Sequence, residues 1–213
     1  MTENLKQMQD DLYHGRIDEV ESATRQALDG GMPAQEILNQ GLIAGMDVVG
    51  RDFKNGDLFI PEVLMAARAM HAGLEVLRPS LAESGASTLG KVVIGTVAGD
   101  LHDIGKNLVS MMLQGAGFEI VDLGTDVSPE QFVEAVRSEG ANLVGMSALL
   151  TTTMPKMKTT IEALAEAGLG NQVSVLVGGA PVTAAYAKQI GADAYAGDAV
   201  GSVDTARQLV GAE

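Results

Sequence analysis

The chain has 213 residues, of which 46% are hydrophobic, so it carries enough apolar material for a folded core. Its 14 basic and 28 acidic side chains give a formal net charge of −14, which disfavours binding to nucleic-acid backbones. The absence of cysteine excludes disulfides, Cys-ligated zinc, iron–sulfur clusters and cysteine nucleophiles.

The first part of the chain, residues 1–87, predicts a four-helix bundle, because apolar residues recur there at helical spacing. Its polar, acidic start lacks the apolar run of a signal peptide, and no stretch reaches the ~18 apolar residues of a membrane span, so we expect a cytoplasmic protein. The segment RDFKNGDLFI should connect the last two helices, and Glu83–Gly90 should form a linker. The expected helices cover about residues 2–13, 16–29, Pro33–Gly50 and a last one beginning at Pro61.

The second part, residues 88–213, alternates short β-branched runs with helical segments. This pattern predicts a flavodoxin-like (Rossmann-like) doubly wound sheet of five parallel strands, in the order 2-1-3-4-5. The expected strands are Lys91–Ala98, Phe118–Asp122, Leu143–Ser147, Val173–Val177 and Ala194–Ala196. The expected helices cover residues 105–116, 128–139, 153–168, 181–190 and 198–211.

Polar and very small residues gather where three of these strands end, which is the ligand-binding edge of such a sheet. Gly99–Asn107 follows the first strand, Ser147–Thr153 the third and Gly178–Ala180 the fourth. The spacing of Gly99, Gly105 and Lys106 does not match a P-loop, and no GxGxxG follows the first strand. A phosphate-accepting receiver would need an aspartate where Ser147 stands.

The remaining pattern is Asp-x-His-x-x-Gly, formed by Asp100, His102 and Gly105. A neutral imidazole is a good ligand for a transition metal, and a carboxylate on its other nitrogen orients it. One histidine cannot hold a bare metal ion, but it is sufficient when a macrocycle supplies the other donors. The many glycines would leave a slot for a large, flat cofactor.

DLHDIGKN, with SALLTT and GGAPV downstream, resembles the cobalamin-binding domain shared by methionine synthase and the corrinoid proteins of methyltransferase systems. MDVVGRDFKNGDLFIPEVLMAARAM resembles the helical cap that precedes this domain. The resemblance implies a helical cap over residues 1–87 and a cobalamin-binding α/β domain over 88–213. Its size and layout are most similar to the free-standing corrinoid proteins of methanol, methylamine or methoxy-compound methyltransferases.

The resemblance also implies roles for individual residues. His102 would be the axial cobalt ligand, Asp100 would orient it, and Ser147 would extend this hydrogen-bonded relay. Further expected contacts of the cobalamin and its nucleotide tail are Asp103, Ile104, Gly105, Leu149, Thr151, Thr152, Gly178, Gly179, Ala180 and the turn Tyr195–Asp198. The cap would cover the cofactor with Met46, Val49, Phe53, Phe59 and Met70, with Gly56 and Pro61 shaping the turn that carries Phe59.

The function implied is that of a methyl carrier. Cobalt(I) of the corrinoid would accept a methyl group from a substrate:corrinoid methyltransferase, and the methylcobalamin would pass it to a second one that acts on tetrahydrofolate or a thiol. A reductive activase would be a third partner, while nucleic acid and membranes would not be partners. Such a protein is a subunit of a methyltransferase system rather than a stand-alone catalyst.

Several alternatives stay open at this point. The chain could be a cobalamin-responsive sensor, or a hydrolase that holds a divalent metal with Asp100, His102 and Asp103. Asp103 could simply cap the following helix, and Lys106 could be a solvated residue of its first turn. Thr151–Thr153 could cap the next helix, and the apolar cap residues could be ordinary core.

Overall fold

The computed structural model describes residues 3–84 and 88–211. The chain divides into two compact units, Met1–Ser87 with Gly115–Gly117, and Thr88–Gln114 with Phe118–Glu213. The predicted boundary between residues 87 and 88 stays a prediction, because it adjoins residues 85–87, which lie outside the described residues. No helix in the described ranges combines the length and apolarity that a membrane span requires.

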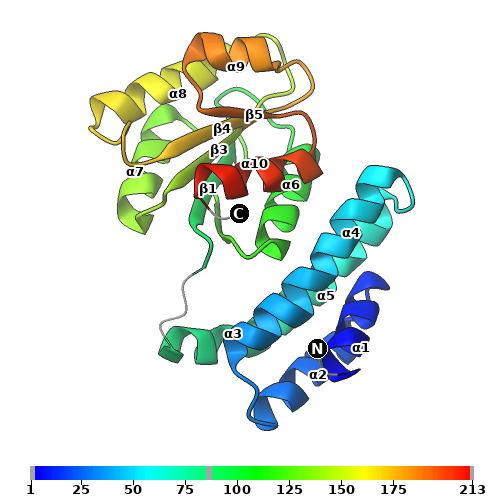
Figure 1. The fold of residues 1–213 in the computed structure, drawn as a ribbon. Helices are drawn as coiled ribbons and strands as arrows, with labels where there is room; N and C mark the ends of the chain where they lie inside the picture. The colour runs from blue at the N-terminus through cyan, green and yellow to red at the C-terminus, as the bar shows by residue number, and fades with distance from the viewer. Residues whose placement is uncertain (1–2, 85–87, 212–213) are drawn as a thin grey trace. The chain divides into compact units, whose positions relative to one another are not determined.

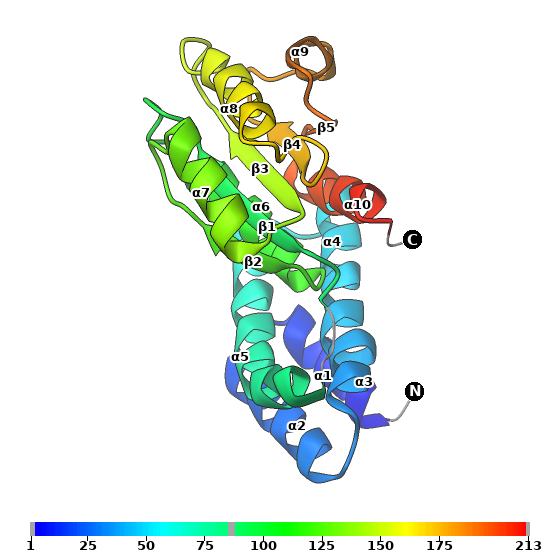
Figure 2. The same cartoon turned by 90° about the vertical axis from the view of Figure 1, so that its left-hand side faces the viewer.

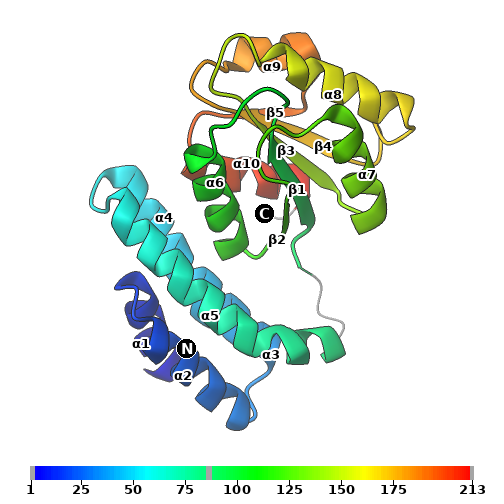
Figure 3. The ribbon, with the colours of Figure 1, turned by 180° about the vertical axis from the view of Figure 1, so that it is seen from behind.

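The first unit is built of helices, as the apolar spacing predicts (Figure 3). Three segments, α3, η1 and α4, follow one another without a break, and η1 has π-helical hydrogen bonding. The third helix therefore ends at Asn55 rather than near Gly50, where Gly56 takes the left-handed conformation (φ +82°) that ends helices. The helices are α1 (Glu3–Tyr13), α2 (Ile17–Asp29), α3 (Ala34–Glu36), η1 (Ile37–Ile43), α4 (Ala44–Asn55) and α5 (Ile60–Ser84).

Buried aliphatic and methionine side chains hold these helices together. They recur at three- and four-residue spacing, so each helix turns one apolar stripe inward. Gly73 of α5 is needed for this packing, because a Cβ there would lie 2.8 Å from Leu42 of η1. The buried set includes Leu5, Met8, Leu12, Val20, Ile37, Leu42, Val63, Met70 and Leu77.

The second unit contains a five-stranded, wholly parallel sheet in the order β2-β1-β3-β4-β5, which confirms the predicted order. Two predicted strands are observed with their expected bounds, and the others shift by one or two residues. The strands are β1 (Lys91–Thr96), β2 (Glu119–Asp122), β3 (Leu143–Ser147), β4 (Ser174–Gly178) and β5 (Ala194–Ala196).

Helices cover both faces of this sheet (Figures 1 and 2). The core on one face joins side chains of α7, α8 and α9 to the strands, while α6 and α10 lie on the other face. The chain thus leaves β1 and β3 toward opposite faces, and the loops after these strands meet at one edge. The helices are α6 (Ile104–Gly115), α7 (Pro129–Glu139), α8 (Pro155–Glu166), α9 (Ala184–Ile190) and α10 (Ala199–Leu209).

Candidate functional site

Asp100, in the loop after β1, is fully buried and accepts hydrogen bonds on both carboxylate oxygens. Oδ1 accepts from the backbone N–H of His102 at 3.2 Å and from its ring Nδ1 at 2.6 Å. Oδ2 accepts from the N–H groups of Leu149 and Leu150 at 2.8 and 3.3 Å and from Thr153 Oγ1 at 2.7 Å. The turn after β3 therefore wraps around the carboxylate that holds the histidine.

These donors keep the carboxylate ionised. Burial by itself raises the pKa of Asp100, but the hydrogen bonds from Thr153 and His102, with the backbone N–H of Leu149, bring the pKa well below its usual range. A buried negative charge is tolerated here because both carboxylate oxygens accept hydrogen bonds, one from His102 and the other from the turn after β3.

His102 is oriented by this carboxylate and half exposed to solvent. Because a carboxylate only accepts, Nδ1 carries the proton and Nε2 keeps its lone pair. In the part of the chain that the structure describes, no hydrogen bond is found to Nε2. Thr96 Oγ1, at the end of β1, additionally donates to the carbonyl of His102 at 2.9 Å. The imidazole thus presents a preoriented nitrogen lone pair.

The hydroxyl that reaches Asp100 belongs to Thr153 and not to Ser147, so the predicted relay through Ser147 is wrong. Ser147 pairs with Thr96 and Gly178 as the last residue of β3, and its backbone direction is set by the sheet. Thr153 comes close because the turn folds back, with the N–H of Thr153 donating to Leu150 at 3.1 Å. The threonines after β3 had suggested only a helix cap or a cofactor contact.

Exposed leucine and isoleucine side chains surround the His102 loop. Leu101 is 73% and Ile104 81% exposed, and Leu149 and Leu150 in the turn after β3 are about four-tenths exposed. Exposed aliphatic groups gathered on two neighbouring loops indicate a surface that an apolar ligand covers. Leu101 and Leu150 were missed by sequence reasoning, although large apolar residues in a loop beside a histidine were the available signal.

The glycines of the site fall into two kinds. A Cβ at Gly105 would meet nothing within 4 Å, so open space lies beside this residue. A Cβ at Gly179, by contrast, would lie 2.0 Å from the carbonyl oxygen of Ala148, and one at Gly178 would lie 3.1 Å from that of Ala196. Gly105 thus fits a ligand slot. The glycines at 178 and 179 are instead explained by neighbouring backbone that leaves no room for a side chain.

The other predicted contacts are distributed unevenly. Asp103 directly precedes α6 and accepts from Asn107 Nδ2 at 3.2 Å, and Asp198 caps α10 by accepting from the N–H of Gly201. Thr151, Thr152 and Ala180 are exposed. In the helical unit Met46, Val49 and Met70 are buried and Phe53 is half-buried, while Phe59 is 68% exposed.

Lys106 is not the solvated residue that its place in the first turn of α6 suggested. Its side chain is 1% exposed, and Nζ forms an ion pair with Asp122 at the end of β2. Nζ also donates to Asn107 Oδ1 at 2.6 Å. The start of α6 is thereby attached to the neighbouring strand.

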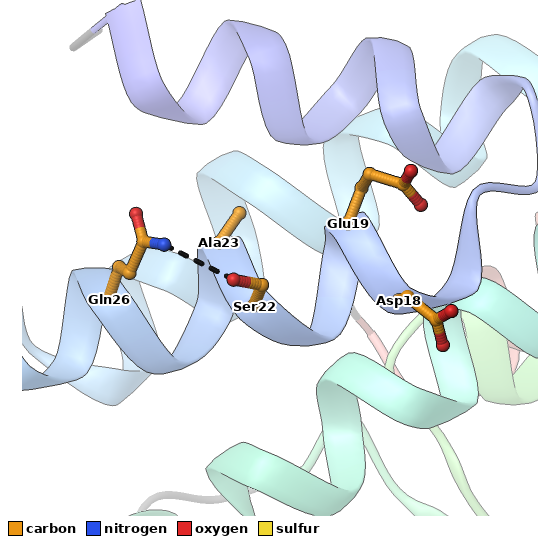
Figure 4. A pocket seen from close by; sticks show the side chains of 5 residues that line it. All are labelled: Asp18, Glu19, Ser22, Ala23 and Gln26. Atoms are coloured by element: carbon orange, nitrogen blue, oxygen red, sulfur yellow. Dashed lines mark hydrogen bonds between the residues drawn. The ribbon is translucent and has the colours of Figure 1, made fainter.

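A surface hollow on α2 contains none of the predicted site residues (Figure 4). Asp18, Glu19, Ser22, Ala23 and Gln26 line it, and Gln26 Nε2 donates to Ser22 Oγ at 3.1 Å. Among the residues that the structure describes, no group of three His, Asp or Glu side chains could hold a metal ion. The site chemistry therefore centres on His102.

Comparisons with known proteins show which family the chain belongs to. Residues 90–205 match the family described as B12 binding domain, and residues 5–78 match a second family of the same description. Dimethylamine corrinoid protein 1 of Methanosarcina acetivorans is 50% identical over 182 residues, covering 85% of each chain. Dimethylamine corrinoid protein 2 of Methanosarcina mazei is 47% identical, covering 98% of this chain and 97% of its own.

Among solved structures, the methanol:cobalamin methyltransferase complex MtaBC from Methanosarcina barkeri contains a similar chain. The TM-score is 0.87 at 31% identity, and the match covers 99% of this chain and 81% of that one. The match thus covers both the helical unit and the unit with the parallel sheet. The chain belongs to the family of B12-binding corrinoid proteins.

Proposed function

We propose that this protein binds a corrinoid, with His102 as its axial cobalt ligand, and carries methyl groups between methyltransferases. The observation that supports this most directly is the free Nε2 of an imidazole whose other nitrogen is held by the buried carboxylate of Asp100. His102 would supply one nitrogen to the cobalt of a bound corrinoid. When bound, the corrinoid supplies a reduced cobalt that accepts a methyl group and releases it to an acceptor.

The residues around His102 fit the flat, largely apolar surface of a corrin. Leu101, Ile104, Leu149 and Leu150 would contact it, and the open space beside Gly105 would admit the nucleotide tail. The other expected contacts of the corrin and its tail lie at the same sheet edge, and we keep them as proposed contacts: Asp103, Thr151, Thr152, Ala180 and the Gly178–Gly179 turn. Of the predicted cap contacts we retain Phe59, whose side chain is exposed, whereas Met46 and Val49 are buried in the core of the helical unit.

The hydrogen bonds to Asp100 determine the charge of its carboxylate. Because the donors around Asp100 lower its pKa, the carboxylate stays ionised at neutral pH. Those same donors occupy the carboxylate, which argues against the hydrolase alternative, since that alternative needs Asp100 as a metal ligand.

Loading the purified protein with cobalamin tests the proposal. We expect a cobalamin spectrum in which a histidine replaces the cofactor's own base, with nitrogen splitting in the electron paramagnetic resonance spectrum of the cobalt(II) form. His102→Ala should remove this splitting, whereas His71→Ala, which changes an exposed histidine of α5, should retain it. Absence of cobalamin uptake, or splitting that survives His102→Ala, would contradict the proposal.

The partners follow from the carrier role. We propose a methylated amine as the methyl source, on the strength of the dimethylamine corrinoid proteins to which the chain is similar. A methylamine:corrinoid methyltransferase should methylate the reduced, loaded protein faster than a methanol-specific one. The acceptor methyltransferase, the reductive activase and the cytoplasmic location stay predictions, as does the absence of nucleic-acid and membrane partners.

A further inference from the structure

The loop that carries His102 has a backbone neighbour in the segment after β2. Thr96 donates its N–H to the carbonyl of Gly124 at 2.9 Å, and Val127 donates to the carbonyl of Thr96 at the same distance. Val97 and Val127 then form an isolated parallel bridge. The segment 124–127 therefore runs beside the chain as it leaves β1 and approaches Asp100.

Asp126 binds the two peptide groups that flank the Gly99–Asp100 peptide in this loop. Its Oδ1 accepts from the N–H of Gly99 at 2.6 Å, and its own N–H donates to the carbonyl of Asp100 at 3.0 Å. Asp126 is the non-glycine residue with positive φ (+56°) among those described, a conformation that aspartate tolerates better than most residues. Gly99 is left-handed as well, with φ +82°.

The other end of the His102 loop is held by Asp122, the last residue of β2. Asp122, at the end of β2, forms an ion pair with the buried Lys106 and accepts from the N–H of Gly124 at 2.8 Å. Two carboxylates placed four residues apart thus fasten the chain on either side of His102. The Asp100–His102 pair has little freedom to move as long as the contacts of Asp122 and Asp126 remain.

We propose that Asp126 is a positioning residue for the axial ligand: it fixes the peptide groups before Gly99 and after Asp100, and through them the carboxylate that orients His102. This inference deepens the proposed corrinoid function and depends on it. Asp100 must meet five donors at once, so a rotation of the preceding peptide would pull its carboxylate away from the turn after β3. The direction of Nε2 would then vary as well.

Two substitutions at Asp126 separate the hydrogen bond from the backbone conformation. Asp126→Asn keeps an acceptor oxygen and the preference for positive φ, whereas Asp126→Gly keeps the conformation and removes the acceptor. Ser128→Ala is the matched control, because it breaks the capping box of α7 in the same connection without touching the His102 loop.

The first measurement uses the cobalamin-loaded protein in the cobalt(II) state. In Asp126→Gly we expect the ratio of histidine-bound to histidine-free cobalt, read from nitrogen splitting, to fall about 3- to 10-fold, as for one lost hydrogen bond of ordinary strength. Asp126→Asn and Ser128→Ala should stay close to wild type. A ratio unchanged in Asp126→Gly, or reduced equally in either of the other two variants, would overturn the proposal.

The second measurement needs no cofactor and keeps the two hypotheses apart. The backbone N–H groups of Leu149 and Leu150 donate to Asp100, so their hydrogen exchange in the cofactor-free protein reports the position of the carboxylate. Faster exchange at both residues in Asp126→Gly alone supports the inference, and wild-type rates refute it. If wild-type protein lacks the nitrogen splitting, the corrinoid proposal fails, and exchange still decides whether Asp126 positions Asp100.

Discussion

Asp100 shows how a charge can be buried at the edge of a sheet. Its carboxylate is removed from water, yet two backbone N–H groups of the turn after β3, a hydroxyl and the His102 ring all donate to it. The free energy of desolvation is offset only while these donors remain, because an ionised group without partners is costly to bury.

Thr153→Val should therefore destabilise the protein in a pH-dependent way. We expect a loss of about 1.5–3 kcal/mol in the free energy of unfolding at pH 7, since a hydrogen bond to a charged group disappears. A carboxyl with a lowered pKa stabilises the fold above its unfolded value of about 3.9, and this contribution fades as the pH falls below it. The difference from wild type should thus shrink on acidification.

Urea unfolding at pH 7 and pH 3 measures this difference. Thr152→Val serves as control, because Thr152 is exposed in the same turn and should change stability little. A difference that grows as the pH is lowered would contradict the assignment of Thr153 to the buried carboxylate.

Substitution with alanine should distinguish the two kinds of glycine at the site. Gly105→Ala places its methyl group in open space within α6, so we expect unchanged or slightly higher stability without cofactor and cobalamin affinity lower by about tenfold. Gly179→Ala should instead cost about 2–4 kcal/mol of stability, because its Cβ collides with the backbone of Ala148 at φ +124°. Thermal unfolding measures the stability of the two variants, and titration with cobalamin measures their affinity. Equal stability and equal affinity of the two variants would contradict the proposed ligand slot beside Gly105.

At the level of elements, the attachment of α6 to β2 was hidden in the sequence. Lys106 looks like an ordinary first-turn lysine, and only the crossover from β1 through α6 to β2 brings it to Asp122. A buried ammonium group needs such a partner.

We expect local order to be lost when the ammonium group of Lys106 is removed. Lys106→Met should cost about 1–3 kcal/mol of stability and accelerate hydrogen exchange in the first turn of α6. Lys156→Met, at an exposed position in the first turn of α8, is the matched control and should leave both unchanged. If the two variants were equally stable, the ion pair would have no role in holding α6.

Over the whole molecule, each unit has its own set of buried side chains. Leu12 lies in the core of the helical unit and Val144 in that of the sheet, both fully buried. Leu12→Ala should cost about 2–5 kcal/mol and Val144→Ala about half as much, each chiefly in its own unit. Hydrogen exchange resolved by segment measures this, and an equal loss of protection in both units would show a single cooperative core instead.

The sequence by itself determined the helical and α/β units, the strand order and the Asp100–His102 pair. The helices follow from a periodicity of 3.6, and the strands and their order follow from short β-branched runs that alternate with helices. The pair follows from a motif of neighbouring residues. It also predicted Leu143–Ser147 and Ala194–Ala196 with their observed bounds. The continuation of the third helix to Asn55 was missed, because the polar residues after Gly50 hid it.

Only the tertiary structure decided which groups surround that pair. It placed the hydroxyl of Thr153 rather than that of Ser147 at Asp100, brought Asp126 to the N–H of Gly99, and buried Lys106 against Asp122. Each of these contacts joins residues sixteen or more positions apart, so none follows from local spacing. Their geometry depends on how turns fold back at the edge of a parallel sheet, where the loops after β1, β2 and β3 come together.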